Sequence, residues 1–155
     1  MHSMEEFHRV LNVNVIGTFN VIRHACHLMC DNQPDTNGQR GVIINTSGIS
    51  AQEGQIGQIA YSAACGALAS MTLPLSRDLA NAGIRCCTIM PGVFDDTKMV
   101  EPLADKVKKM LAMMIPFPSR LGAPDEFAHL VQNIIQNNYI NGENIRLDGA
   151  IRMPP

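Results

Sequence analysis

One tyrosine, Tyr61, stands in a segment whose neighbours could give it a chemical role. Ser47 and Ser50 precede it, and Cys65 follows four residues later. A phenol works as a general acid or base when a neighbour lowers its pKa of about 10, because roughly one phenol in a thousand is ionised at pH 7. A nearby cation would lower that pKa by about 1–3 units, but Cys65 is not a cation. A packed helical aromatic residue is therefore the ordinary interpretation of Tyr61.

The five cysteines and five histidines form no second candidate site. An odd number of cysteines, the absence of C-x-x-C and the adjacent Cys86 and Cys87 indicate reduced thiols rather than a disulfide framework. His24, Cys26 and Cys30 could be considered as metal ligands, but only the two cysteines share a helical face and no fourth ligand is apparent. We expect packed side chains there and no metal.

The composition is that of one globular domain. The chain has 155 residues, of which 46% are hydrophobic and 17% are charged, with a formal net charge of −2. Lysines and arginines form no run, so charge gives no indication of nucleic acid or an anionic membrane as a partner. No uninterrupted apolar run approaches the roughly 20 residues that cross a bilayer.

Hydrophobic periodicity predicts alternating helices and strands. The first helix opens with the capping-box pattern Ser3-x-x-Glu6. In chain order we expect a helix over 4–30, a strand over 41–46, a helix over 60–81, a strand over 83–90, short helices over a pocket within 95–114, a helix from 124 and a strand over 143–147. This alternation predicts an α/β fold with a parallel sheet covered by helices on both faces, although three strands are too few for a full doubly wound sheet.

Five short motifs occur in an order that narrows the family. They are Asn12–Gly17, Ile43–Ser47, Tyr61–Cys65, Pro91-Gly92 before Thr97, and Asn141–Ala150. Together they resemble the short-chain dehydrogenase/reductase (SDR) family over essentially the whole chain. Three further segments, 57–58, 116–122 and 145–153, resemble the members of that family that act on 3-hydroxyacyl-CoA.

The resemblance implies a fold and an activity. The chain is expected to be a single partial SDR domain over 1–155, the C-terminal part of a Rossmann-like doubly wound parallel sheet whose N-terminal strands are absent. The family is an NAD-dependent oxidoreductase family, and this branch oxidises 3-hydroxyacyl-CoA or hydroxysteroid substrates. In it a tyrosine is the acid/base, a serine binds the substrate oxygen, a lysine holds the nicotinamide ribose and lowers the tyrosine pKa, and a helix asparagine holds a water in the proton relay.

Carried over residue by residue, the resemblance gives three candidate site residues and two departures. Tyr61 matches the catalytic tyrosine, which also touches the cofactor, Asn14 matches the catalytic asparagine, and Phe94 matches a cofactor contact. The serine position holds Gly48 and the lysine position holds Cys65. Loss of the activating cation alone is expected to cost on the order of ten- to a thousandfold in rate. We therefore expect a catalytically impaired chain.

Several of these matches have ordinary structural alternatives. Asn14 could bond to local backbone groups, and Phe94 could anchor a loop. The pair Asp95-Asp96 adds one residue before Thr97 and shifts it from the family position. Ser47 is adjacent to the serine position, but a slip of one residue along a strand turns a side chain to the opposite face.

The glycine-rich turn T-G-x-x-x-G-x-G, with which the family binds NAD, does not occur in these residues. Gly54 and Gly57 have the wrong spacing and do not directly follow a strand. We therefore expect this chain to bind NAD poorly or not at all. The family's sheet order also implies that the strand 42–46 lacks one neighbour and forms a bare apolar edge.

Two other interpretations stay open. The chain could be a non-catalytic interaction protein that associates with itself or with full-length SDR subunits through helices 4–30 and 60–81, which match the family's main subunit interface. It could also have little stable structure. The family implies a mitochondrial location, whereas the N-terminal sequence MHSMEEFHRV has no presequence character and alone predicts a cytoplasmic protein.

Overall fold

Three strands form one parallel sheet in the order β1-β2-β3. The computed structural model describes residues 2–155. The strands are β1 (Gly41–Thr46), β2 (Ile84–Pro91) and β3 (Asn144–Leu147). Ile43 of β1 lies opposite Cys86 of β2, and Thr88 of β2 lies opposite Asn144 of β3. The parallel α/β arrangement predicted from the alternation of helices and strands is thus confirmed.

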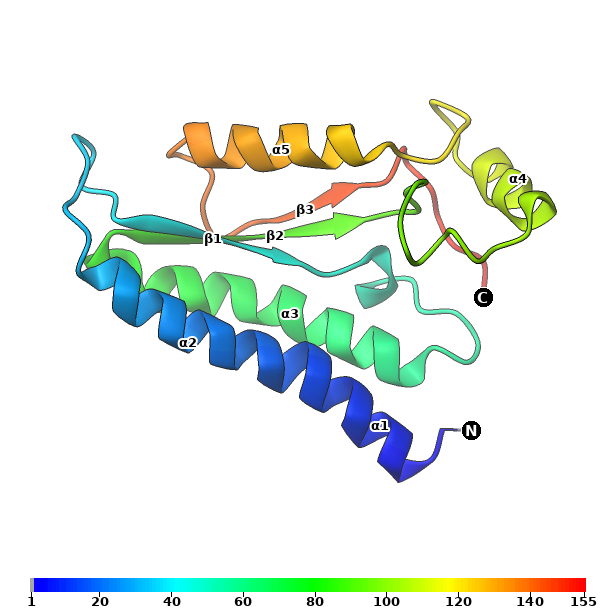
Figure 1. Ribbon diagram of the computed structural model, residues 1–155, viewed down its shortest axis with the longest axis horizontal. Coiled ribbons are helices and arrows are strands. Elements are labelled where there is room, and N and C mark those ends of the chain that lie inside the picture. The colour runs from blue at the N-terminus through cyan, green and yellow to red at the C-terminus, as the bar shows by residue number, and fades with distance from the viewer. Residues whose placement is uncertain (1) are drawn as a thin grey trace.

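Helices cover both faces of this sheet. They are α1 (Met4–Leu11), the π-helical turn η1 (Asn12–Ile16), α2 (Gly17–Cys30), the 3-10 turn η2 (Ile49–Ala51), α3 (Ile59–Asp78), the 3-10 turn η3 (Ala80–Ala82), α4 (Asp105–Met113) and α5 (Pro124–Gln136). Figure 1 shows α5 on one face of the sheet, α3 and the continuous α1–η1–α2 helix on the other, and α4 beyond one end of the strands. The predicted strands and long helices are all present, with the second helix ending three residues earlier than expected. The segment 95–114, predicted to hold several short helices over a pocket, contains the single helix α4, and no residue of α4 lines a described pocket.

The core divides by the alternation of side chains along the strands. Ile43 and Cys86 face α2 and α3, where they pack with Ile22 and Ile84. The neighbouring side chains face the other way, and Cys87 and Ile89 pack against Ile134 of α5. Because both faces of β2 are covered, all of its residues from Ile84 to Met90 are buried, including the polar Arg85 and Thr88.

The helix α3 packs on the face of the sheet opposite α5 (Figure 1). It buries a straight row of residues at four-residue spacing, made of Ala60, Ala64, Leu68, Thr72 and Ser76. The helix is long and apolar enough to cross a membrane by length and composition alone, with a mean hydropathy of 1.3 over 18 residues. Its buried row and its packing on β2 are the features of a core helix, which passes the same test. Tyr61 directly follows Ala60, the first residue of this row, so the packing of the row fixes the direction in which the Tyr61 side chain leaves the helix.

The beginning of α1 confirms half of the predicted capping box. Ser3 caps the helix, and its Oγ accepts a hydrogen bond from the Glu6 backbone N–H at 3.1 Å. The Glu6 side chain does not return to Ser3 but forms an ion pair with Arg9 at 2.7 Å. The second half of the predicted box is therefore wrong, because an i,i+3 arginine competes for the carboxylate.

The strand β1 is an edge of the sheet, as the sequence predicted. Beside it lies a groove of about 550 Å³ between β1 and α2, lined by Ile44, Ile22, Val13 and Val21 among others. Val13 is 64% exposed and Val21 is 67% exposed, although both are apolar and face this groove. An uncovered apolar strand edge of this kind is a pairing surface for another strand.

Candidate active site

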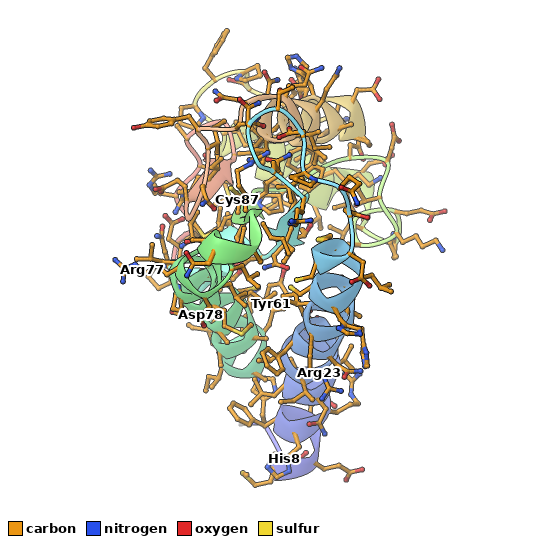
Figure 2. All side chains as sticks on the ribbon, turned by 90° about the vertical axis from the view of Figure 1, so that its left-hand side faces the viewer. His8, Arg23, Tyr61, Arg77, Asp78 and Cys87 are labelled. Atoms are coloured by element: carbon orange, nitrogen blue, oxygen red, sulfur yellow. The ribbon has the colours of Figure 1, made fainter. Side chains whose placement is uncertain are left out.

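The side chain of Tyr61 meets positions 48 and 65 at one end of α3. A Cβ atom placed on Gly48 would lie 3.1 Å from the Tyr61 hydroxyl oxygen and 3.5 Å from the Cys65 Sγ atom. Tyr61 comes from the first turn of α3, Cys65 from the next turn, and Gly48 from the segment between β1 and η2. In Figure 2, Tyr61 lies between α3 and the long N-terminal helix. The structure thus brings together the three positions that the sequence singled out.

The two nearby serines do not take the place of a hydroxyl at position 48. The Ser47 Oγ atom donates a hydrogen bond to the Cys65 backbone carbonyl oxygen at 2.8 Å, and Ser47 is buried. Ser50 donates to the Oε1 atom of Gln58 at 3.2 Å. Both hydroxyl groups therefore have backbone or side-chain partners of their own. Gly48, which has no side chain, therefore offers no hydroxyl group to the Tyr61 phenol.

The surroundings of Tyr61 favour the neutral phenol. Burial raises the pKa of Tyr61 to about 12, and the neighbouring Cys65 thiol acts in the same direction. Burial also raises the pKa of the Cys65 thiol, although hydrogen bonds with Tyr61 and Ser47 act the other way. Cys65 is therefore neutral at pH 7, and Tyr61 can donate a hydrogen bond but is a poor base.

Asn14 lies in the π-helical turn η1, where the long N-terminal helix is locally wider. Its Nδ2 atom donates a hydrogen bond to the Val10 carbonyl oxygen at 2.9 Å, and the residue is exposed. A π turn inserted in an α-helix often accompanies a functional position. The hydrogen bond is the local backbone role that the sequence left open, and the role of Asn14 in a proton relay stays a prediction.

Phe94 packs against α5 rather than toward Tyr61. Its ring meets the Phe127 ring edge-on with centroids 6.1 Å apart, and a Cβ atom on Gly122 would lie 2.8 Å from it. Thr97 donates from its hydroxyl to the Phe94 carbonyl oxygen at 3.1 Å and so closes the loop on itself. This is the loop-anchor arrangement, and a cofactor contact by Phe94 stays a prediction.

The residues that the structure describes offer no cradle for the pyrophosphate of NAD. Such a cradle is a glycine-rich turn between a strand and the N-terminus of the following helix. Gly54 and Gly57 lie between η2 and α3, and a Cβ atom on Gly54 would collide with the Ser62 hydroxyl group. Position 65, where the resemblance implies a lysine that holds the nicotinamide ribose, is occupied by a cysteine. Residues 2–155 therefore do not fit the pyrophosphate of NAD.

No group of three or more histidine, cysteine or acidic side chains that could hold a metal ion occurs among residues 2–155. His24 instead lies next to the Arg23 side chain, with 3.4 Å between the ring and guanidinium nitrogens. Cys26 is half-buried, and burial raises the pKa of its thiol. It packs against the cluster formed by Ile22 and Ile43, as predicted, whereas His24 and Cys30 are exposed and the prediction of packed side chains is wrong for them.

One group of charged residues near the site was not recognised from the sequence. Glu53, Arg146, Asp148 and Arg152 form an ionic cluster between the loop before α3 and the C-terminal tail. The only signal in the sequence is the resemblance of the segment 145–153 to the family, and that resemblance assigns no role to its charges. Nothing in local spacing connects position 53 to position 146.

Comparisons with known proteins agree with the geometry. A family model described as short chain dehydrogenase matches residues 1–108. The chain is 60% identical over 154 residues to 3-hydroxyacyl-CoA dehydrogenase type-2 of Bos taurus and 36% identical over 143 residues to ipsdienol dehydrogenase of Ips pini. These alignments cover 99% and 92% of this chain.

A solved structure shows the same arrangement of elements. The crystal structure of 3-hydroxyacyl-CoA dehydrogenase type-2 from Mycobacterium avium superposes with a TM-score of 0.93 at 42% identity and covers 99% of this chain. The match covers 59% of that protein, and likewise 59% of the bovine relative and 56% of the Ips pini relative. The chain therefore spans somewhat more than half the length of these proteins.

Proposed function

The chain belongs to the short-chain dehydrogenase family, and from that premise we propose that it is the substrate-side half of a dehydrogenase for 3-hydroxyacyl-CoA or hydroxysteroid substrates, with a disabled acid–base centre. The sequence identity to 3-hydroxyacyl-CoA dehydrogenase type-2 supports the substrate class. The three-stranded sheet corresponds to the C-terminal part of the family's doubly wound sheet.

One observation carries the proposal of impairment: Gly48 and Cys65 stand around the Tyr61 hydroxyl where the family has a serine and a lysine. The place of the acid–base centre is kept, since a Cβ atom at position 48 would be within contact of the phenol. A serine there would add a hydroxyl group for the substrate oxygen, and a lysine at position 65 would add a cation. Neither group is present, so the phenol stays protonated.

What this chain's own residues contribute is therefore limited to positioning. The neutral Tyr61 can donate a hydrogen bond to a carbonyl oxygen of a bound substrate. It cannot accept the proton of an alcohol efficiently near pH 7, because burial holds its pKa near 12. Since residues 2–155 present no glycine-rich turn for the pyrophosphate, hydride transfer requires a cofactor site that includes residues other than these.

A second function, association with full-length dehydrogenase subunits or with itself, is favoured by exposed apolar residues on the two predicted interface helices. Apolar residues on the predicted interface helices are widely exposed, with Ile16 at 60%, Phe19 at 48% and Leu73 at 45%. Exposed apolar residues that gather on one region of a surface commonly mark protein contacts. This proposal needs no cofactor and no base, and so is compatible with Gly48 and Cys65.

The proposed function is tested in a chimera that places the N-terminal part of a relative before these residues. The N-terminal part of the bovine relative is joined to residues 1–155 carrying Gly48→Ser and Cys65→Lys. We expect NAD-dependent oxidation of 3-hydroxybutyryl-CoA or of a hydroxysteroid, measured by NADH absorbance. A folded chimera that binds NADH but oxidises neither substrate would contradict the assignment. Co-purification of the unchanged chain with the tagged bovine protein tests the association.

A further inference from the structure

An ionic cluster joins the C-terminal tail to the loop that leads into α3. The Arg146 guanidinium group lies between two carboxylates, with its Nη1 atom 2.8 Å from Glu53 Oε1 and its Nη2 atom 2.6 Å from Asp148 Oδ2. Arg152 approaches the same two carboxylates, at 3.4 Å from Glu53 and 3.5 Å from Asp148. Two positive and two negative side chains therefore form one ion-pair network between distant parts of the chain.

Three members of this cluster are shielded from water. The side chains of Glu53, Arg146 and Asp148 are 17%, 18% and 8% exposed, and Arg152 is more exposed. Burial works against the charged form of Glu53, yet hydrogen bonds from Arg146 and from the Met153 backbone hold the pKa of this carboxyl below its ordinary value. Shielded pairs are screened by salt less than surface pairs are, and breaking one leaves an uncompensated charge.

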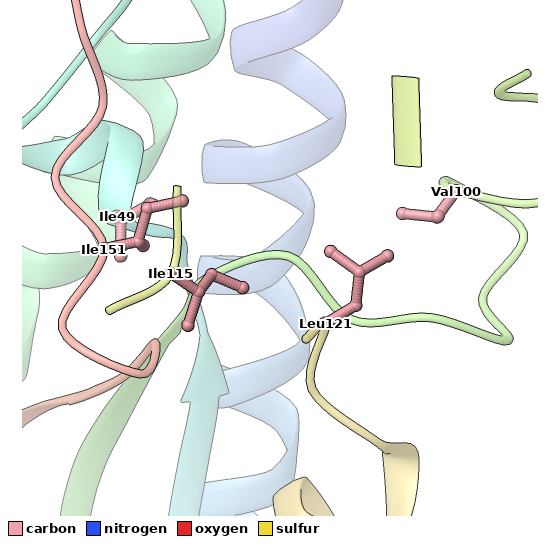
Figure 3. Close-up of a cluster of buried hydrophobic side chains, with 5 residues drawn as sticks. All are labelled: Ile49, Val100, Ile115, Leu121 and Ile151. Atoms are coloured by element: carbon pink, nitrogen blue, oxygen red, sulfur yellow. The ribbon is translucent and has the colours of Figure 1, made fainter. Parts of the chain in front are cut away.

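Contacts of other kinds fasten the same two segments. The Met153 backbone N–H donates to Glu53 Oε2 at 3.0 Å, and Gln55 donates from its side chain to the Pro154 carbonyl oxygen at 3.3 Å. Ile49 of η2 and Ile151 of the tail belong to one buried cluster, and Figure 3 shows them side by side. The tail thus holds the loop over 49–55 with ionic, polar and apolar contacts.

The fastened loop contacts both sides of the candidate site. The whole loop, 49–58, begins directly after Gly48 and ends at Gln58, three residues before Tyr61. Gly54 packs so closely on the Ser62 hydroxyl group that a Cβ atom there would collide with it. That Ser62 Oγ atom is buried without a hydrogen-bond partner among the described residues, which shows how tightly the loop covers the first turn of α3.

We propose that Glu53, Arg146, Asp148 and Arg152 form a positioning clasp through which the C-terminal tail fixes the loop 49–58 and thereby the approach of position 48 to Tyr61. The proposal rests on the proposed function only for the role given to Tyr61. The four side chains are positioning residues, because their ion pairs join β3 and the tail to the loop and do not involve the phenol. Loss of the clasp leaves the sheet intact and frees the loop.

The test uses the full chain with Tyr139→Phe. This change leaves Tyr61 as the only tyrosine, and the chain has no tryptophan. Glu53→Gln keeps the side-chain size and removes one charge. We expect amide hydrogen exchange over 49–58 to rise about tenfold or more, the effect of losing one charge-assisted hydrogen bond, with β1 and β2 unchanged. Tyrosinate absorbance at 295 nm should also appear at lower pH, because a freed loop exposes the phenol to water.

Glu126→Gln is the matched control. It removes an equally charged carboxylate from the Arg120–Glu126 pair, whose side chains are 53% and 44% exposed and lie on and before α5. It should leave exchange over 49–58 and the tyrosinate onset as they are. Expressed as a free energy, the rise in exchange over 49–58 in the double variant with Glu53→Gln and Arg146→Gln should be smaller than the sum of the rises in the two single variants. The reason is that both residues belong to one network.

Two results would overturn the clasp. One is unchanged exchange over 49–58 in Glu53→Gln; the other is a uniform rise along the whole chain with no separate change at the loop. If Glu53→Gln does not fold, Arg152→Gln decides with the same two readouts, since Arg152 is the exposed member and tolerates change best. None of these measurements uses substrate or cofactor, so failure of the clasp is distinct from failure of the proposed dehydrogenase function.

Discussion

A chimera with the N-terminal part of the bovine relative is expected to oxidise substrate roughly 10²–10⁴-fold faster when residues 1–155 carry Gly48→Ser and Cys65→Lys than when they keep Gly48 and Cys65, the range that positioned general acid–base catalysis contributes. The lysine would stand one helical turn from Tyr61, in the place of a thiol that lies near position 48. Its charge would lower the phenol pKa, which burial and the thiol now raise.

The comparison needs a control for the added charge alone. Cys30→Lys places a lysine at an exposed cysteine at the end of α2, away from Tyr61. This variant should give no gain in turnover. Steady-state rates for the three chimeras, each with its NADH affinity measured, separate chemistry from binding. A gain of less than threefold for the double substitution, in a chimera that binds NADH, would contradict the assignment of the two positions.

The isolated chain is expected not to bind NADH at micromolar concentrations, with or without the two substitutions. The pyrophosphate needs backbone N–H groups at a helix N-terminus after a glycine-rich turn, and residues 2–155 present none. Lost contacts of this kind should weaken binding by about a thousandfold or more, the equivalent of roughly 4 kcal/mol. Restoring the acid–base residues adds no pyrophosphate site, so the doubly substituted chain should also show no turnover.

A titration of NADH fluorescence measures this directly. The chain has no tryptophan, so the signal comes from the cofactor alone. The chimera serves as the positive control and should show saturable enhancement. A saturable change at micromolar NADH with the isolated chain would mean that other residues of this fold cradle the dinucleotide.

Much of the fold follows from local patterns in the sequence. The apolar run 41–46 and the Pro91-Gly92 stop define strands that the structure reproduces within one residue. The amphipathic spacing after Pro124 predicts α5, whose Ile134 is fully buried. The family resemblance assigned Gly48 to the serine position, and the structure places it opposite the Tyr61 phenol. These features depend on spacings of a few residues or on the order of motifs, which a sequence displays openly.

The remaining features depend on contacts between distant residues. Glu53 and Arg146 are separated by 93 positions along the chain, and only the folded tail brings them within 2.8 Å. The π turn at Asn12–Ile16 could not be predicted, because the hydrophobic spacing of residues 4–30 is that of one continuous helix. The α4 helix occupies only part of the mixed segment 95–114, where Pro102 and Pro116 limit it from outside. Local pattern could not supply these.

The central claim is that Tyr61 keeps the position of a catalytic base but lacks the groups that activate it. A folded state that holds the phenol proton up to pH 12 has a stabilising contribution below pH about 10, and loses it as the pH rises toward 12. The most direct measurement is a spectrophotometric titration of Tyr61 in the Tyr139→Phe chain, with far-ultraviolet circular dichroism recorded at each pH. With a pKa of about 12, we expect roughly a tenth of the Tyr61 phenol to be ionised at about pH 11 while the chain stays folded, against roughly nine tenths of a free phenol, and ionisation at lower pH with Cys65→Lys. Ionisation of Tyr61 below its ordinary pKa in the folded, otherwise unchanged chain would contradict the account.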